Sequence, residues 1–93
     1  MSKISIRFLQ PIAGYLGFNK TGGFSLEADL DAPGPLKNAI APLRMNGLNI
    51  LQGLQSEQIK IMVAINGLIK HAGLEAEVQD GDEVSILPLL GGG

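Results

Sequence analysis

Three glycines at the carboxyl terminus, Gly91, Gly92 and Gly93, are the residues whose placement most directly suggests chemistry. Glycine has no side chain to pack, so we expect this segment to project as a mobile tail, thin enough to thread a narrow enzyme channel. The α-carboxylate at its tip is ionised at neutral pH and is a poor electrophile. A mixed anhydride with AMP would supply a leaving group for attack by sulfur or an amine. From composition alone, however, a frayed end is the commoner explanation of terminal glycines.

A second glycine-containing segment, residues 14–21, reads G-Y-L-G-F-N-K-T and is one residue away from a phosphate-binding P-loop. Asn19 stands where that motif requires its second glycine, so the backbone cradle for phosphate would be compromised. A P-loop fold also needs a larger parallel sheet than a chain of 93 residues can build. We therefore expect an ordinary flexible hairpin loop.

Carboxylates gather at Asp80, Asp82 and Glu83. An EF-hand loop would need further oxygen ligands and a closing glutamate at its twelfth position, and nothing suitable follows here. We expect a solvated turn and no metal site. The same carboxylates, with Glu75 and Glu77 adding to their field, are candidates for steering a basic partner.

The composition excludes several classes of function. A chain of 93 residues with 45% hydrophobic and 17% charged residues forms one foldable domain with a modest core. Because it has no cysteine, it holds no disulfide, zinc ribbon, iron–sulfur cluster or thiol nucleophile. The single histidine, His71, has no catalytic partner at a readable spacing and is expected to be a surface or packing residue.

Charge and hydropathy bear on partners and location. A net charge of −2 and an aromatic content of 4% argue against nucleic-acid binding. No apolar run approaches the ~20 residues that a membrane helix needs. The alternating N-terminal residues do not form the apolar block of a signal peptide. We therefore expect a cytoplasmic protein without a membrane partner.

The elements that must position the tail are predicted from hydrophobic periodicity. Alternation predicts strands over residues 4–8, 24–30, 59–65, 68–70 and 83–87. Residues 36–43 place apolar side chains on one helical face, with Pro35 tolerated at the first position and Pro42 ending the helix. Asn66-Gly67 predicts a tight hairpin turn, and Asp80-Gly81 marks another turn.

The region between residues 44 and 58 is the least readable, since Leu48, Leu51 and Leu54 fit a short helical turn that Gly47 and Gly53 weaken. The order of elements nevertheless predicts an α+β fold, with a mixed sheet packed on one main helix. We expect a single domain over residues 1–93, with residues 91–93 as a flexible glycine tail.

Several motifs follow one another in the last third of the chain. Residues 61–67 read I-M-V-A-I-N-G, residues 80–84 read D-G-D-E-V, and Pro88, Gly92 and Gly93 follow. In this order and spacing they resemble the ubiquitin-like sulfur carrier family, which includes the thiamine sulfur carriers and, most similar here, the small subunit of molybdopterin synthase. Residues 31–58 are longer and richer in glycine than the family pattern, and Leu89 and Gly91 depart from it.

The resemblance implies a β-grasp fold and a carrier protein rather than an enzyme. Gly93 would carry the activated carbonyl, Gly92 would permit threading, and Gly91, Leu90 and Pro88 would set the exit and nearby docking of the tail. An adenylyltransferase related to the ubiquitin activators would use ATP and Mg²⁺ to adenylate Gly93. A sulfurtransferase would then replace AMP with sulfur, giving a thiocarboxylate, while this chain itself binds no cofactor.

The resemblance further implies a sulfur-accepting enzyme, most directly the large subunit of molybdopterin synthase, which forms the dithiolene of the cofactor. Thiamine thiazole formation and tRNA thiolation are neighbouring pathways, although the thiamine carriers are typically shorter. A ubiquitin-like modifier that forms isopeptide bonds through Gly93 would begin with the same adenylate. A plain β-grasp interaction domain with an idle tail is the remaining alternative.

Overall fold

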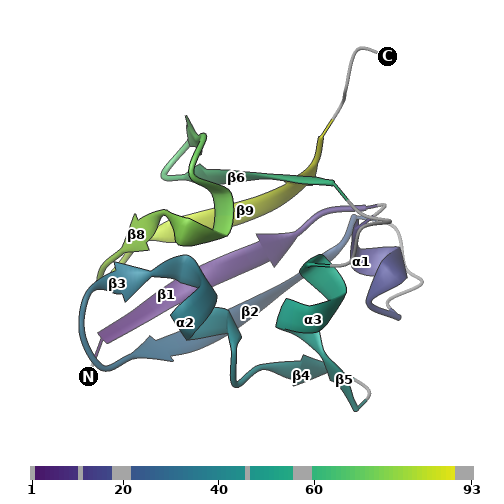
Figure 1. Cartoon of the computed structure of the whole chain (residues 1–93), viewed down its shortest axis with the longest axis horizontal. Coiled ribbons are helices and arrows are strands. Elements are labelled where there is room, and N and C mark those ends of the chain that lie inside the picture. The colour runs from purple at the N-terminus through teal and green to yellow at the C-terminus, as the bar shows by residue number, and fades with distance from the viewer. Residues whose placement is uncertain (1, 11, 18–21, 46, 56–59, 90–93) are drawn as a thin grey trace.

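The computed structural model describes residues 2–10, 12–17, 22–45, 47–55 and 60–89 (Figure 1). Its strands are β1 (Ser2–Phe8), β2 (Phe24–Leu30), β3 (Gly34–Pro35), β4 (Arg44–Met45), β5 (Leu48–Asn49), β6 (Ile61–Ile65), β7 (Leu68–Lys70), β8 (Glu77–Val78) and β9 (Glu83–Pro88). Its helices are α1 (Ile12–Tyr15), α2 (Leu36–Ile40), α3 (Ile50–Leu54) and the short 3₁₀ helix η1 (Gly73–Glu75).

The main sheet has five strands in the order β2-β1-β9-β6-β7. Strand β9 runs parallel to β1, and the β1–β2, β6–β9 and β6–β7 pairs are antiparallel. Two small ribbons, β3–β8 and β4–β5, lie outside this sheet. The predicted α+β fold with a mixed sheet is therefore confirmed.

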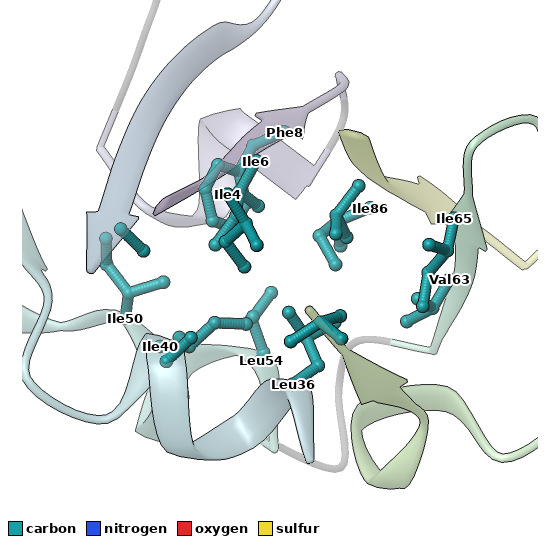
Figure 2. Close-up of a cluster of buried hydrophobic side chains, with 14 of the residues drawn as sticks. Ile4, Ile6, Phe8, Leu36, Ile40, Ile50, Leu54, Val63, Ile65 and Ile86 are labelled. Carbon is teal, nitrogen blue, oxygen red and sulfur yellow. The ribbon is translucent and has the colours of Figure 1, made fainter. Parts of the chain in front are cut away.

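The core lies between one face of the main sheet and the helices. Strand alternation turns one set of side chains from β1, β6 and β9 toward α2 and α3, where they are buried (Figure 2). The principal buried side chains are Ile4, Ile6, Phe8, Leu36, Ile40, Ile50, Leu54, Val63, Ile65, Val84 and Ile86. None of the helices in the described ranges is long and apolar enough to cross a membrane.

The connection between β1 and β2 differs from the plain flexible loop expected there. Residues 12–15 form α1, and Ile12, Ala13 and Leu16 are buried in the main core. The helix forms because its apolar side chains can pack beside the end of the sheet, which outweighs the weak helix propensity of Gly14. Residues 18–21, including Asn19, lie outside the described part of the chain.

The segment after α2 is more ordered than its glycine content indicates. Strands β4 and β5 form a hairpin, and Asn49 then caps α3 by accepting a hydrogen bond from the Gln52 backbone N–H at 3.0 Å. A short helical turn therefore forms over residues 50–54 and includes Leu51 and Leu54, whereas Leu48 lies on β5. A Cβ on Gly53 would lie 2.8 Å from Leu16 Cδ2, so this glycine allows α3 to pack closely against the segment after α1.

Helix α2 is shorter than the predicted one. It ends at Ile40, two residues before Pro42, and Pro35 precedes it as the extended N-cap residue instead of occupying its first turn. The helical layer is consequently shared between α2 and α3, each five residues long.

Candidate functional site at the carboxyl end of β9

Strand β9 occupies the centre of the main sheet and leads to the last described residues. Its residues 83–86 pair with residues 5–8 of β1, and its residues 84–88 pair with residues 61–65 of β6. A strand paired along both edges has its backbone polar groups satisfied on both sides. Both edges of β9 are paired through Ile86, and residues 87 and 88 at its end are held by β6 alone.

Pro88 is the last residue of β9 and lies opposite Ile61. Proline has no backbone N–H, so it suits the end of a strand better than its interior. The Leu89 N–H then donates to the Lys60 carbonyl at 3.0 Å. Pro88 is thus placed where the chain leaves the sheet, the position at which a residue would set the exit of a tail.

The remaining predicted tail residues are Leu90, Gly91, Gly92 and Gly93, and all four lie outside the described residues. Their assigned roles in carrying, threading and docking stay predictions.

The sheet face that points away from α2 and α3 carries apolar side chains beside the end of β9. In the strand register, Met62 lies opposite Leu87, and Ala64 lies opposite Ile69. Ile69 is 45% exposed, and Leu89, two residues beyond Leu87, is 46% exposed. We call these five residues the outer patch; Ala64 is itself buried at 8% exposure, so the accessible apolar surface comes from the other four. Apolar side chains gathered on a surface mark interaction sites more often than single exposed ones do.

Two cationic side chains accompany the outer patch. Arg7 lies opposite Ser85 on the same sheet face, and Lys60 is joined to Leu89 by the backbone hydrogen bond. Both are exposed, and neither forms an ion pair with any other residue in the described ranges. The surface at the end of β9 therefore combines apolar groups with two positive charges that form no ion pair to another described residue, which favours a partner with acidic side chains around an apolar centre.

The acidic turn lies at the opposite end of β9 from Pro88. At a strand rise of about 3.3 Å per residue, Glu83 and Pro88 are roughly 17 Å apart along the strand. The structure therefore does not bring the predicted steering residues Asp80, Asp82 and Glu83 together with the tail exit. Their steering of a partner stays a prediction.

Two of these carboxylates have a structural role. Asp82 is 9% exposed, and its carboxylate accepts hydrogen bonds from Asn66 Nδ2 at 3.0 Å and from the Gln79 N–H at 2.9 Å. Asp80 Oδ1 accepts from the Lys3 N–H at 2.8 Å. The turn is thereby joined both to the β6–β7 hairpin and to the start of β1.

Asn66 completes this connection. Its Oδ1 accepts from the Glu83 N–H at 2.9 Å, and its own N–H donates to the Glu83 carbonyl at 2.7 Å. The asparagine and aspartate of the two sequence motifs thus meet in space. We call the contacts of Asn66 with Asp82 and Glu83 the polar clasp.

The other predicted side chains do not form a reactive group. His71 is exposed, as expected for a surface residue, and Glu75 forms an ion pair with Lys37 at 2.6 Å. Glu77 is exposed on β8. Within the described ranges, no three His, Cys, Asp or Glu residues are arranged to hold a metal ion.

These features define a β-grasp protein of the ubiquitin-like class, whose last strand occupies the centre of the sheet. A model of the ThiS family matches residues 25–93, and the chain belongs to this family of ubiquitin-like sulfur carriers. The crystal structure of SAMP1 from Haloferax volcanii aligns over 98% of this chain and 99% of that chain, with 18% identity and a TM-score of 0.62. That likeness shows the fold. No curated protein matches the chain.

Family membership settles the general class of function. Proteins of this family are carriers rather than catalysts, so the chain is a carrier protein, as predicted. Membership also implies interaction with activating enzymes of the ubiquitin-activator type and with enzymes that accept sulfur.

Sequence reasoning predicted the tail but did not predict the outer patch. The signal was present, because residues 61–65 read I-M-V-A-I and are apolar at both alternating sets of positions. A strand needs apolar side chains on only one face when helices cover only that face of its sheet. Met62, Leu87 and Leu89 were therefore in excess of what the core required.

The polar clasp predicts that the carboxylate of Asp82 stabilises the fold and that the carboxylate of Glu83 does not. Asp82→Ala should lower the free energy of unfolding by about 1–3 kcal/mol, because two donors lose a largely buried acceptor. Glu83→Gln, which leaves the backbone contacts of residue 83 in place, should change it by less than about 0.5 kcal/mol. Urea denaturation followed by circular dichroism measures both. Equal stabilities of the two variants would contradict the structural role of Asp82.

Proposed function

We propose that this chain carries sulfur as a thiocarboxylate on Gly93 and donates it in molybdopterin synthesis, as the small subunit of molybdopterin synthase. The observation that carries the proposal is the ThiS-family match, which extends through residue 93 and includes the terminal glycines. The motifs at Asn66, Asp82 and Pro88 support it, since the first two form the polar clasp and the third ends β9.

The chemistry takes place on the terminal carboxylate. One carboxylate oxygen of Gly93 attacks the α-phosphorus of ATP, and pyrophosphate leaves with its Mg²⁺, giving an acyl-adenylate on the activating enzyme. A sulfur nucleophile at the oxidation level of sulfide then attacks the carbonyl, the bond to AMP breaks, and a thiocarboxylate remains. After the recipient takes the sulfur, an oxygen from water restores the carboxylate. No side chain of this domain is required as an acid, base or nucleophile.

The contribution of this domain is to present the tail. Strand β9 is paired with both β1 and β6 through Ile86, and with β6 alone at residues 87 and 88, so the tail would be presented from the centre of the sheet. The outer patch, with Arg7 and Lys60 beside it, supplies a surface on which an activating or accepting enzyme docks while the tail enters its active site. Binding energy from the patch would orient the reacting carboxylate without adding bulk near it.

The mass of the protein tests the carrier chemistry directly. After incubation with ATP, an activating enzyme and a sulfur donor, intact and C-terminal-peptide masses should show one terminal oxygen replaced by sulfur at Gly93. Deletion of Gly93 should abolish this product and change the free energy of unfolding by less than about 0.5 kcal/mol. An unmodified terminus, with the activating enzyme active on its own carrier, or a product that persists in the deletion variant, would refute the mechanism.

The outer patch generates a separate prediction on docking. Leu89→Asp should weaken binding to the activating enzyme about tenfold, roughly 1.4 kcal/mol, because it places a carboxylate within an apolar contact. Leu68→Asp is the matched control, since Leu68 is 63% exposed but lies opposite Ile65, which pairs with Val84 near the start of β9. Calorimetric titration measures both affinities. Equal loss in the two variants would show that the patch has no special part in docking.

The recipient is tested by reconstitution. The thiocarboxylated protein mixed with a matched molybdopterin synthase large subunit should convert the cyclic pyranopterin precursor to the dithiolene product. Absence of turnover would contradict the molybdopterin assignment and favour tRNA thiolation or thiamine synthesis.

A ubiquitin-like modifier remains a second candidate, because an acyl-adenylate on Gly93 is equally open to attack by a lysine amine. Lysine-linked adducts in cell extract that disappear on deletion of Gly92 and Gly93 would favour conjugation. An idle tail would instead leave biological activity unchanged by the same deletion.

A further inference from the structure

The turn between β6 and β7 contains a dipeptide with its own chemical reactivity. Asn66 has φ 52° and Gly67 has φ 85°, and the two residues connect Ile65 to Leu68. Positive φ at both central positions defines the type I′ turn for which Asn-Gly is preferred. Because glycine has no Cβ, its backbone nitrogen is unusually open to the preceding side chain.

That openness permits deamidation. The Gly67 nitrogen attacks Asn66 Cγ and forms an N–C bond, the Cγ–Nδ2 bond breaks, and the displaced nitrogen leaves as ammonia with the proton from the Gly67 amide. Water then opens the resulting cyclic imide at either carbonyl, giving aspartate or isoaspartate at position 66. The two reaction steps together consume only water and need no oxidant, reductant or enzyme.

The fold holds the Asn66 amide at both of its polar atoms. Nδ2 donates to Asp82 Oδ1 at 3.0 Å, and Oδ1 accepts from the Glu83 N–H at 2.9 Å. The backbone N–H of Asn66 is held as well, by the Glu83 carbonyl at 2.7 Å. Turning Cγ toward the Gly67 nitrogen would break both side-chain bonds and would leave Asp82, which is 9% exposed, without one of its donors. The residue is exposed to water but not free to react.

We propose that Asn66 is a latent deamidation site, and that the polar clasp of Asp82 and Glu83 suppresses the reaction in the folded protein. The same contacts that fix the hairpin onto the start of β9 thereby protect the chain from chemical ageing. If the clasp opens and the reaction occurs, the product places a carboxylate where Nδ2 donated to Asp82. Two carboxylates then face each other where one hydrogen bond stood, so the modification prevents the clasp from closing again.

The chain provides an internal reference for the test. Residues 45–48 read M-N-G-L and residues 65–68 read I-N-G-L, so Asn46-Gly47 has nearly the same local sequence as Asn66-Gly67. In a denaturing concentration of urea, the two sites should deamidate at similar rates. Peptide mapping by mass spectrometry, with chromatographic separation of aspartate and isoaspartate products, follows both sites in one sample.

The full-length folded protein, incubated in mildly alkaline buffer, should deamidate at Asn66 at least about tenfold more slowly than the urea-denatured chain, which corresponds to ~1.4 kcal/mol. Asp82→Asn, whose amide has one acceptor oxygen in place of two, should accelerate the reaction at Asn66 severalfold. Asp80→Asn is the matched control, because Asp80 belongs to the same turn but bonds Lys3. It should leave the rate at Asn66 unchanged.

Equal rates at Asn66 in the folded and denatured chain would overturn the proposal, and so would equal acceleration by both variants. Circular dichroism establishes whether each variant is folded. A variant that carries the deamidation product, aspartate, at position 66 gives a second test that does not rely on Asp82 variants. Asn66→Asp should fold but unfold at a lower urea concentration than the wild-type protein, and a midpoint equal to that of the wild type would contradict the predicted conflict with Asp82.

Discussion

The pairing of β9 with β1 and β6 is the constraint on which the rest of the structure depends. Strand β9 is the last element of the chain, yet it lies in the middle of the sheet, parallel to the first element. The sheet is therefore complete only when both ends of the chain have met. Such long-range pairing carries a loop-closure cost before its contacts form. Strand β9, which precedes the terminal residues, is thus in place only in the folded domain.

The segments that connect the strands supply much of the remaining core. A domain of this size buries a limited fraction of its surface, so few apolar groups can be left outside. Ile12 and Leu16 from the β1–β2 connection, and Ile50 and Leu54 from α3, are all buried. These contributions explain why the described parts of the glycine-containing connections form helices, which the glycines in their sequence do not favour. Gly53 illustrates the point, because its missing Cβ makes room for Leu16.

The sequence predicts the long strands well because their alternation records a single buried face. Strands β1, β2 and β9 lie within a residue or two of their expected bounds, and the Asn66-Gly67 turn, which places the three-residue β7, is where its residue types predict it. The two-residue strands and α1 escape prediction because four or fewer residues define no period. For the site, the terminal motif indicates the carrier tail. The meeting of Asn66 with Asp82 is a tertiary contact between motifs that are 16 residues apart, which no local pattern contains.

The two ends of β9 are electrically different, and this difference bears on how a partner approaches. At the start of the strand, Glu83 and Glu27 both lie opposite Ser5, and Asp80 bonds the Lys3 N–H, while the Lys3 ammonium group forms an ion pair with Glu27 at 3.9 Å. Farther along the strand, Arg7 lies opposite Ser85, and Lys60 lies beside Leu89 just beyond the end of β9. Although the chain has a net charge of −2, its charge changes along β9, from mainly negative near the start of the strand to positive near its end. Such a gradient orients an incoming acidic surface toward the positive end during diffusion, and it weakens as salt is added. The polar clasp lies at the start of β9, and the terminal residues follow its other end. Binding of a partner at the end of β9 therefore need not disturb the hydrogen bonds at its start.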